Sequence, residues 1–192
     1  AAGAQGAGKV AVGGSVSIGH LGNNTRAYTT GLSAANKAQI IAQGNIGVNA
    51  NDNLSAIVIA GVVGGAGTVA VGASLTTLVT SNLVEAYIGE YSSVKGRGKK
   101  GTRQVFTGST SSAGAWQQAN MRGVWVTAVS DHSFRSFAVG GVGAGNTAVA
   151  GSVSVTTVGD TVRAHIDHNS SVNDNNSDAE DDSSGPHQSV NV

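Results

Sequence analysis

The sequence predicts an all-β protein, a parallel β-helix (β-solenoid) with one inserted loop region. A 24-residue unit occurs three times, at 6–29, 65–88 and 143–166, with spacings of 59 and 78 residues. Apolar and polar residues alternate within the copies, which is typical of strands. The 192 residues include 29 Gly and only 4% aromatic side chains. Such small residues suit a thin interior between two facing sheets.

The repeated unit determines the expected architecture. Without gaps, the first copy shares 12 of its 24 residues with the third copy and 11 with the second. A module that recurs along a chain indicates a stacked array rather than a single globule. We expect each 59-residue module to form three turns of about 20 residues, each stacked on the last at about 4.8 Å. Gly14, Ala73 and Gly151 occupy one repeat position, where we expect a close approach of two backbones.

The first copy is expected to contain a strand, a turn and a second strand. Strict alternation over 10–18 predicts one buried face that carries Val10, Val12, Val16 and Ile18. The Gly-Asn-Asn segment at 22–24 indicates a turn. The connecting residues 54–63 suit either a buried strand or a helix, and the β-branched side chains there favour the strand.

The later copies repeat this pattern around an insertion. Inward residues are expected to be apolar: Val69, Val71, Ala73, Leu75, Val84, Ala86 and Ile88, then Val149, Val153, Val155, Val162, Ala164 and Ile166. Residues 91–122 have no counterpart between the first two copies and are assigned to the insertion. The repeat segment therefore spans 1–168. The polar, acidic tail 169–192 is expected to be disordered.

Composition and charge exclude several classes of function. The net charge is zero, so we expect neither a specific nucleic-acid partner nor a general attraction to anionic membranes. No cysteine is present, which excludes disulfides and Cys-bound zinc. No apolar run reaches the ~18 residues needed to span a bilayer, so we expect no membrane insertion by this segment. The sequence begins inside a repeat, and we expect a fragment of a larger chain.

The insertion carries the candidate ligand-binding residues. Five of the eleven basic residues lie within 95–103, separated by glycines. They predict a flexible loop that contacts a polyanion such as a sulfated glycan, and the alternative is a solvated surface loop. Trp116 and Trp125 could form a stacking surface for sugars, or close the hydrophobic base of the insertion. The candidate set is Lys95, Arg97, Lys99, Lys100, Arg103 and Trp116.

Other polar residues do not form a recognisable catalytic or metal site. The acidic tail lacks the glycine spacing of a calcium loop. His165 and His168 fall on opposite faces of a strand, and the adjacent residues Asp131, His132 and Ser133 alternate sides and cannot form a triad. We therefore expect neither an enzyme nor a cofactor. Tyr28, Tyr87 and His165 share an outward repeat position, where three turns between copies would separate them by about 14 Å.

The third copy supports a family resemblance. Residues 148–166 read AVAGSVSVTTVGDTVRAHI and resemble the repeats of large filamentous-haemagglutinin or leukotoxin-type filamentous adhesins. The resemblance covers the three copies strongly and the linking strands loosely. It implies a right-handed β-helix exported by type V secretion, and a location that is extracellular or on the bacterial outer-membrane surface. It offers no catalytic motif.

Two functions follow as expectations. The first is a structural, adhesive shaft segment that attaches to host-cell or bacterial surface receptors, glycans among them. The alternative is a module in which the insertion 91–122 binds sulfated glycans or other polyanions. The head of a trimeric autotransporter is a competing architecture, but its module of about 14 residues does not fit spacings of 59 and 78.

Overall fold

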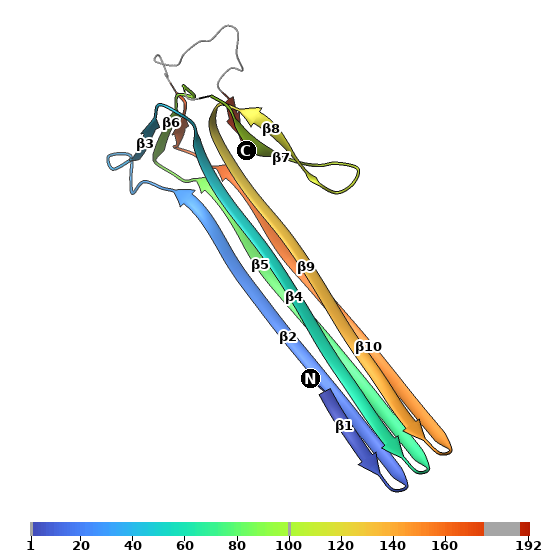
Figure 1. Cartoon of the computed structure of the whole chain (residues 1–192). Coiled ribbons are helices and arrows are strands. Elements are labelled where there is room, and N and C mark those ends of the chain that lie inside the picture. Colours follow the sequence, from blue (N-terminus) through green and yellow to red (C-terminus); the bar gives the residue numbers. More distant parts are fainter. Residues whose placement is uncertain (1, 100, 175–188) are drawn as a thin grey trace. The chain divides into compact units, whose positions relative to one another are not determined.

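The computed structural model describes residues 2–99, 101–174 and 189–192. Five long strands dominate it (Figure 1), namely β2 (Val10–Thr29), β4 (Ile46–Ala66), β5 (Val69–Ile88), β9 (Gly123–Ala144) and β10 (Thr147–Ile166). The shorter strands are β1 (Ala2–Ala7), β3 (Ala38–Ala42), β6 (Ser92–Gly96), β7 (Arg103–Thr110), β8 (Trp116–Met121), β11 (Ser171–Val172) and β12 (Ser189–Asn191). The described residues contain no helix.

The strands form a parallel β-solenoid, which confirms the predicted fold class. Each turn of the chain contributes one strand to each of three sheets, ordered β1-β4-β9-β12, β10-β5-β2 and β11-β6-β3. The pairs β1–β4, β3–β6, β6–β11 and β9–β12 are parallel. Only the hairpin β7–β8 is antiparallel among the described strand pairs whose registers are resolved.

One repeat forms one turn of the solenoid, so the prediction of three turns per module is wrong. Ala2 pairs with Gly61, and the Gly67 amide donates to the Gly8 carbonyl at 3.1 Å. The two residues of each pair are 59 positions apart in the sequence, which is the spacing of the first two copies. The Asn146 amide donates to the Thr68 carbonyl, 78 residues earlier. Segments predicted as separate short strands run on as single strands of about 20 residues, because the Gly/Asn positions between them do not turn.

The chain divides into two compact units. Unit 1 comprises Ala1–Asn23, Asn53–Asn82 and Asp131–Asp160. Unit 2 comprises Asn24–Asp52, Leu83–Ser130 and Thr161–Val192. The boundaries fall at the Asn and Asp positions of the repeat, which the sequence pattern indicates as turns. In the structure these positions lie inside β2, β5 and β10.

The interior of unit 2 is apolar and follows the prediction. Val84, Ala86 and Ile88 of β5 are buried, as expected from the alternation. They belong to a core cluster with side chains from the facing sheet and from β6, namely Val48, Ala50, Val94, Val124 and Val126. Small β-branched residues fill this thin space without aromatic side chains.

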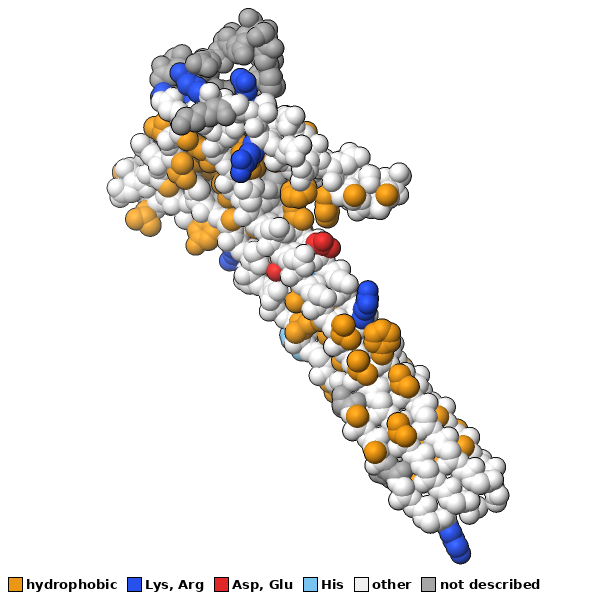
Figure 2. All heavy atoms as spheres, in the orientation of Figure 1, with side chains coloured by type: hydrophobic (Ala, Val, Ile, Leu, Met, Phe, Trp, Pro, Cys, Tyr) orange, Lys and Arg blue, Asp and Glu red, His pale blue; other side chains and the backbone are white. Residues whose placement is uncertain are grey.

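Unit 1 has the opposite arrangement, and here the predicted inward face is wrong. On β5 the inner face carries buried Ala70, Ser74, Thr76, Leu78 and Thr80. The residues predicted to point inward are exposed instead, with Val71 at 40% and Leu75 at 37%. The same holds for Val10, Val12, Val16, Ile18, Val149, Val153 and Val155. Figure 2 shows apolar side chains on the surface along the long strands.

The cause is the continuity of each strand. Successive side chains of a strand alternate between faces, so inward Val84 and Ile88 require every even-numbered residue of β5 to point inward. A turn at 81–82 would have reversed this parity, but β5 continues through those residues.

The predicted close approach of backbones is confirmed for two of the three copies. A Cβ on Gly3 of β1 would lie 2.9 Å from the Gly14 carbonyl oxygen, and a Cβ on Gly140 of β9 would lie 3.3 Å from the Gly151 carbonyl oxygen. A Cβ atom on Gly72 would lie 2.7 Å from Cγ1 of Val142, so the two sheets meet closely at this inner position. On the outer side, Gly14, Ala73 and Gly151 line a shallow groove, and a Cβ on Gly151 would meet no atom within 4 Å.

The insertion and the tail also differ from their predicted bounds. Residues 92–96 form β6, which pairs with β3 from Ala38↔Ser92 to Ala42↔Gly96. The excursion from the solenoid is therefore limited to 97–122. In the tail, β11 pairs with β6 and β12 pairs with β9, so these two segments are not disordered. Residues 175–188 lie outside the described residues.

Candidate binding surface of the inserted hairpin

The basic segment begins on the solenoid rather than in a flexible loop. Lys95 lies in β6 between the buried residues Val94 and Gly96. The Arg97 amide donates to the Ala42 carbonyl at 3.0 Å, and the Lys99 amide donates to the Gln43 carbonyl at 2.8 Å. These hydrogen bonds anchor the backbone of 97–99 to the preceding coil. The prediction of a flexible loop is therefore wrong for this part.

The two ends of the excursion are joined by one amide side chain. Asn45 Nδ2 donates to the Gly101 carbonyl at 3.0 Å, and Asn45 Oδ1 accepts from the Gly123 amide at 2.9 Å. A Cβ on Gly96 would lie 2.6 Å from the Gly123 carbonyl oxygen, so the chain leaves and re-enters the solenoid at one place. Gly98 has φ +65°, a conformation that L side chains rarely adopt.

The hairpin β7–β8 projects from this base. Its strands pair in an antiparallel register that includes Val105↔Ala119 and Arg103↔Met121. At the tip, the Ser111 amide donates to the Ala115 carbonyl at 2.8 Å. Val105 is buried at 4% exposure and Phe106 is half-buried, while Arg103 and Gln104 are exposed. The hairpin therefore contacts the solenoid mainly near the start of β7.

Trp125 of β9 is fixed beside the hairpin. Its Nε1 donates to Asn49 Oδ1 at 3.0 Å, and Thr127 Oγ1 donates to the same oxygen at 2.6 Å. The indole covers Gly47, where a Cβ atom would overlap Nε1 of the ring. Glycine at position 47 thus provides the space for the Trp125 ring.

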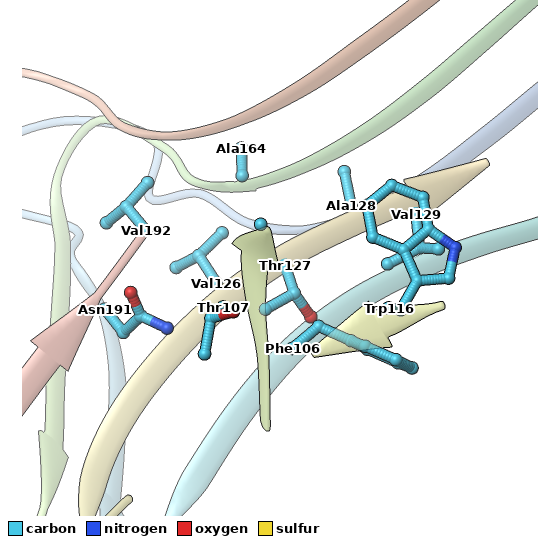
Figure 3. A pocket seen from close by; sticks show the side chains of 11 residues that line it. Phe106, Thr107, Trp116, Val126, Thr127, Ala128, Val129, Ala164, Asn191 and Val192 are labelled. Atoms are coloured by element: carbon cyan, nitrogen blue, oxygen red, sulfur yellow. The ribbon is translucent and has the colours of Figure 1, made fainter. Parts of the chain in front are cut away.

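Two cavities lie at the base of the hairpin, and Phe106 lines both. The first has a volume of about 80 Å³ and is lined by Trp116, Val126 and Val129, among others (Figure 3). The second has a volume of about 280 Å³, and its lining includes Asn49, Asn51, Arg103, Gln104 and Trp125. Trp116, 42% exposed, and Trp125 line different cavities, so they do not form one stacking platform.

The structure separates the predicted site residues. Arg103 lines the second cavity and Trp116 lines the first. Lys95, Arg97 and Lys99 lie along β6 and the residues after it, and they line neither cavity. Lys100 lies outside the described residues.

The cavity residues that were not predicted from the sequence are Asn49, Asn51, Gln104 and Phe106. A signal was available for one of them. The 78-residue offset between the second and third copies, applied to Asn49, points to Thr127, its partner in the structure.

A column of rings lies on the outer face of unit 2. The centroids of Tyr28 and Tyr87 are 4.9 Å apart with an interplanar angle of 4°, and those of Tyr87 and His165 are 5.0 Å apart at 7°. The predicted separation of about 14 Å is wrong because one copy occupies one coil. Arg26 Nε lies 3.3 Å from Glu85 Oε2 beside the column. Burial, together with the negative charges of ionised Tyr28 and of Glu85, raises the pKa of Tyr87 above 10.0.

Unit 1 contains a polar cluster around Asn82, which is 3% exposed. Asn82 Oδ1 accepts from the Asn23 amide at 3.1 Å, and Asn82 Nδ2 donates to Asp160 Oδ1 at 2.7 Å. His132 Nδ1 lies 2.8 Å from Asp160 Oδ2. His132 therefore contacts an aspartate from the adjoining sheet, rather than its sequence neighbours Asp131 and Ser133.

Comparison with protein families finds no matching family model, and comparisons with curated sequences and solved structures find no similar protein. Within residues 2–99, 101–174 and 189–192, no group of three or more His, Cys, Asp or Glu side chains could hold a metal ion. The same residues form no helix that could cross a membrane.

Proposed function

We propose that this chain is a structural, adhesive segment of a larger bacterial surface or secreted protein. Stacked coils provide the scaffold, and segments that leave the coils contact receptors on host or bacterial cells. The segment acts without catalysis or a cofactor. The observation that supports this proposal is the in-register stacking of the three repeat copies, one copy per coil. Type V export and a place outside the outer membrane rest on the resemblance of 148–166 to filamentous adhesin repeats.

A stacked solenoid suits such a role for two physical reasons. Each coil satisfies the backbone hydrogen bonds of its neighbours, so every additional copy lengthens the stack by about 4.8 Å without a new core design. Insertions are tolerated where the chain leaves and re-enters at adjacent points. Gly96 and Gly123 show this arrangement around the hairpin.

A second candidate function is the binding of glycans or other polyanions by the inserted segment. The second cavity favours it, because Arg103 and three amide side chains line the cavity, and none of the described lining residues is acidic. Lys95 and Lys99 add positive charge to the segment that leads into the hairpin. In this case the solenoid is the support and the hairpin is the binding element.

The attachment of coated beads to epithelial cells tests both functions. We expect beads that carry the intact segment to attach, and beads that carry a variant with 97–122 replaced by a short Gly-Ser linker to fall to background. Lys9→Gln, at the turn between β1 and β2, is the matched charge control and should attach normally. Absence of attachment by the intact segment contradicts the adhesive proposal. Full attachment by the hairpin-excised variant contradicts only the second candidate.

A further inference from the structure

We propose that the second cavity binds a single hexuronate residue of a glycan, a pyranose ring that bears a carboxylate. The site lies between the start of β7 and the outer faces of β4 and β9. This inference deepens the second candidate function and rests on it, because it takes the hairpin as the element that contacts the glycan.

The size of the cavity favours one sugar ring. Its volume of about 280 Å³ lies just below the range, roughly 300–1,000 Å³, in which small-molecule sites occur. A stretch of polyanion would instead require an extended charged groove. Lys95, Arg97 and Lys99 do not line the cavity, so they do not extend it into such a groove.

One part of the lining is apolar and rigid. Val105 and Trp125 are buried at 4% and 9% exposure, and Phe106 is half-buried. The Trp125 ring is held by its hydrogen bond to Asn49 and by its packing over Gly47. A pyranose ring has a face of C–H groups, which packs against such a surface and releases water from both.

Another part of the lining consists of amides. Asn49 and Asn51 come from β4, and Gln104 comes from β7. Each amide provides both donors and an acceptor, as the hydroxyl groups of a sugar require. The two hydrogen bonds that Asn49 Oδ1 accepts fix the orientation of its amide. Its Nδ2 group has no hydrogen-bond partner within the described part of the chain and remains for a ligand hydroxyl.

Arg103 provides the charge selectivity. Within the described part of the chain, its guanidinium forms no ion pair and no carboxylate lines the cavity with it. The planar guanidinium can donate two parallel hydrogen bonds to a carboxylate, a geometry that a neutral sugar cannot use. The site should therefore prefer a uronate over the corresponding neutral sugar.

Trp125 fluorescence offers a direct test. The chain contains two Trp residues, so Trp116→Phe leaves Trp125 as the only indole. This variant is titrated with methyl glucuronide and, as the matched neutral probe, with methyl glucoside. We expect a saturable change in emission with a Kd of about 1 mM for methyl glucuronide, a value typical of a ligand with few non-hydrogen atoms. Methyl glucoside should bind about tenfold more weakly.

Two further variants test whether Arg103 is the residue that causes the preference for the glucuronide. Arg103→Gln in the same background should abolish the preference for the glucuronide. Arg135→Gln, which removes an exposed cation of unit 1, should leave it unchanged. Far-UV circular dichroism should be the same for all variants, because both arginines are exposed.

Three outcomes overturn the inference: no saturable change in Trp125 emission, equal affinity for the two sugars, or an unchanged preference in Arg103→Gln. Bead attachment distinguishes a failure of the uronate inference from a failure of the second candidate function. If the triple variant Lys95→Gln, Arg97→Gln, Lys99→Gln abolishes attachment and Arg103→Gln does not, the hairpin region binds polyanions without the uronate site.

Discussion

Tyr87 stands between Tyr28 and His165 in a column of nearly parallel rings. Stacking at about 5 Å follows from the spacing of strands in a sheet, because identical positions in successive coils lie directly above one another. Glu85 and Arg26 form an ion pair beside the column. The phenol of Tyr87 is thus surrounded by a ring on each face and by a carboxylate of its own strand.

The titration of Tyr87 provides a test at the residue scale. Its pKa in the folded state is raised above the unfolded value of 10.0, first by burial and then by the charges of ionised Tyr28 and of Glu85. The folded state therefore prefers the protonated phenol. This contribution to stability is complete below pH 10 and is lost as the pH rises through the folded pKa.

We expect carbon NMR of the Tyr Cζ resonances to show Tyr87 titrating above pH 10. Glu85→Gln should lower this pKa, because one of the charges that raise it is removed. Asp174→Asn removes a carboxylate of unit 2 that is not among the charges acting on Tyr87, and it should leave this pKa unchanged. A Tyr87 that ionises at or below pH 10 contradicts the stacked environment.

The long strands determine which side chains face the interior of the solenoid. Side chains of each strand alternate between the inner and the outer face without interruption over about 20 residues. The apolar residues, however, lie on the outer face in one part of the strand and on the inner face in another. In β5, apolar side chains point outward at 71 and 75 and inward at 84, 86 and 88. The inner face of unit 1 is consequently lined by small and hydroxyl-bearing residues, several of which bond across the sheets. Ser74 Oγ donates to the Val139 carbonyl at 3.1 Å, and Thr76 Oγ1 donates to the Phe137 carbonyl at 3.0 Å.

This assignment of faces predicts unequal effects of two substitutions on β5. Leu78 is fully buried, so Leu78→Ala should lower the free energy of unfolding by about 2–5 kcal/mol. Val71 is 40% exposed, so Val71→Thr should change it by no more than about 0.5 kcal/mol. Urea unfolding of both variants measures the difference. The reverse order of effects would indicate that 69–79 present their other face to the interior.

At the scale of the whole chain, the solenoid is the stable framework and the hairpin is an addition to it. The hairpin contributes one buried apolar side chain, Val105, to the described core, whereas the sheets contribute the others. Its two ends meet at Gly96 and Gly123, where the chain can be joined without moving β6 or β9.

We therefore expect excision of 97–122, with a short Gly-Ser linker, to preserve cooperative unfolding. The free energy of unfolding should fall by about 1.5–3 kcal/mol, the value for burial of one Val. Ile88→Ala, which removes a fully buried side chain of the coil, is the positive control and should cost about 2–5 kcal/mol. Thermal unfolding followed by circular dichroism measures both. Loss of the cooperative transition after excision would show that the hairpin is part of the framework.

Several features of the protein were predictable from local patterns. The repeat copies, their offsets of 59 and 78 residues and the parallel all-β architecture follow from self-similarity and alternation. So does the inward position of Val84, Ala86 and Ile88. Of the candidate site residues, Arg103 and Trp116 line cavities, and their role in binding stays a prediction.

Alternation by itself identifies two faces of a strand but does not say which one is buried. For 10–18 and 69–79, the buried face is determined by strand continuity, because β2 and β5 run on without a turn past Asn23 and Asn82. The Asn residues that indicate turns when the sequence is considered alone form hydrogen bonds between neighbouring coils instead. The side chain of Asn82 is hydrogen-bonded to both Asn23 and Asp160. The cavity beneath the hairpin joins Asn49 to Gln104, which are far apart in the sequence. Local residue patterns thus determined the strands and their repetition, whereas the buried face and the cavity depended on contacts between distant strands, which local patterns do not encode.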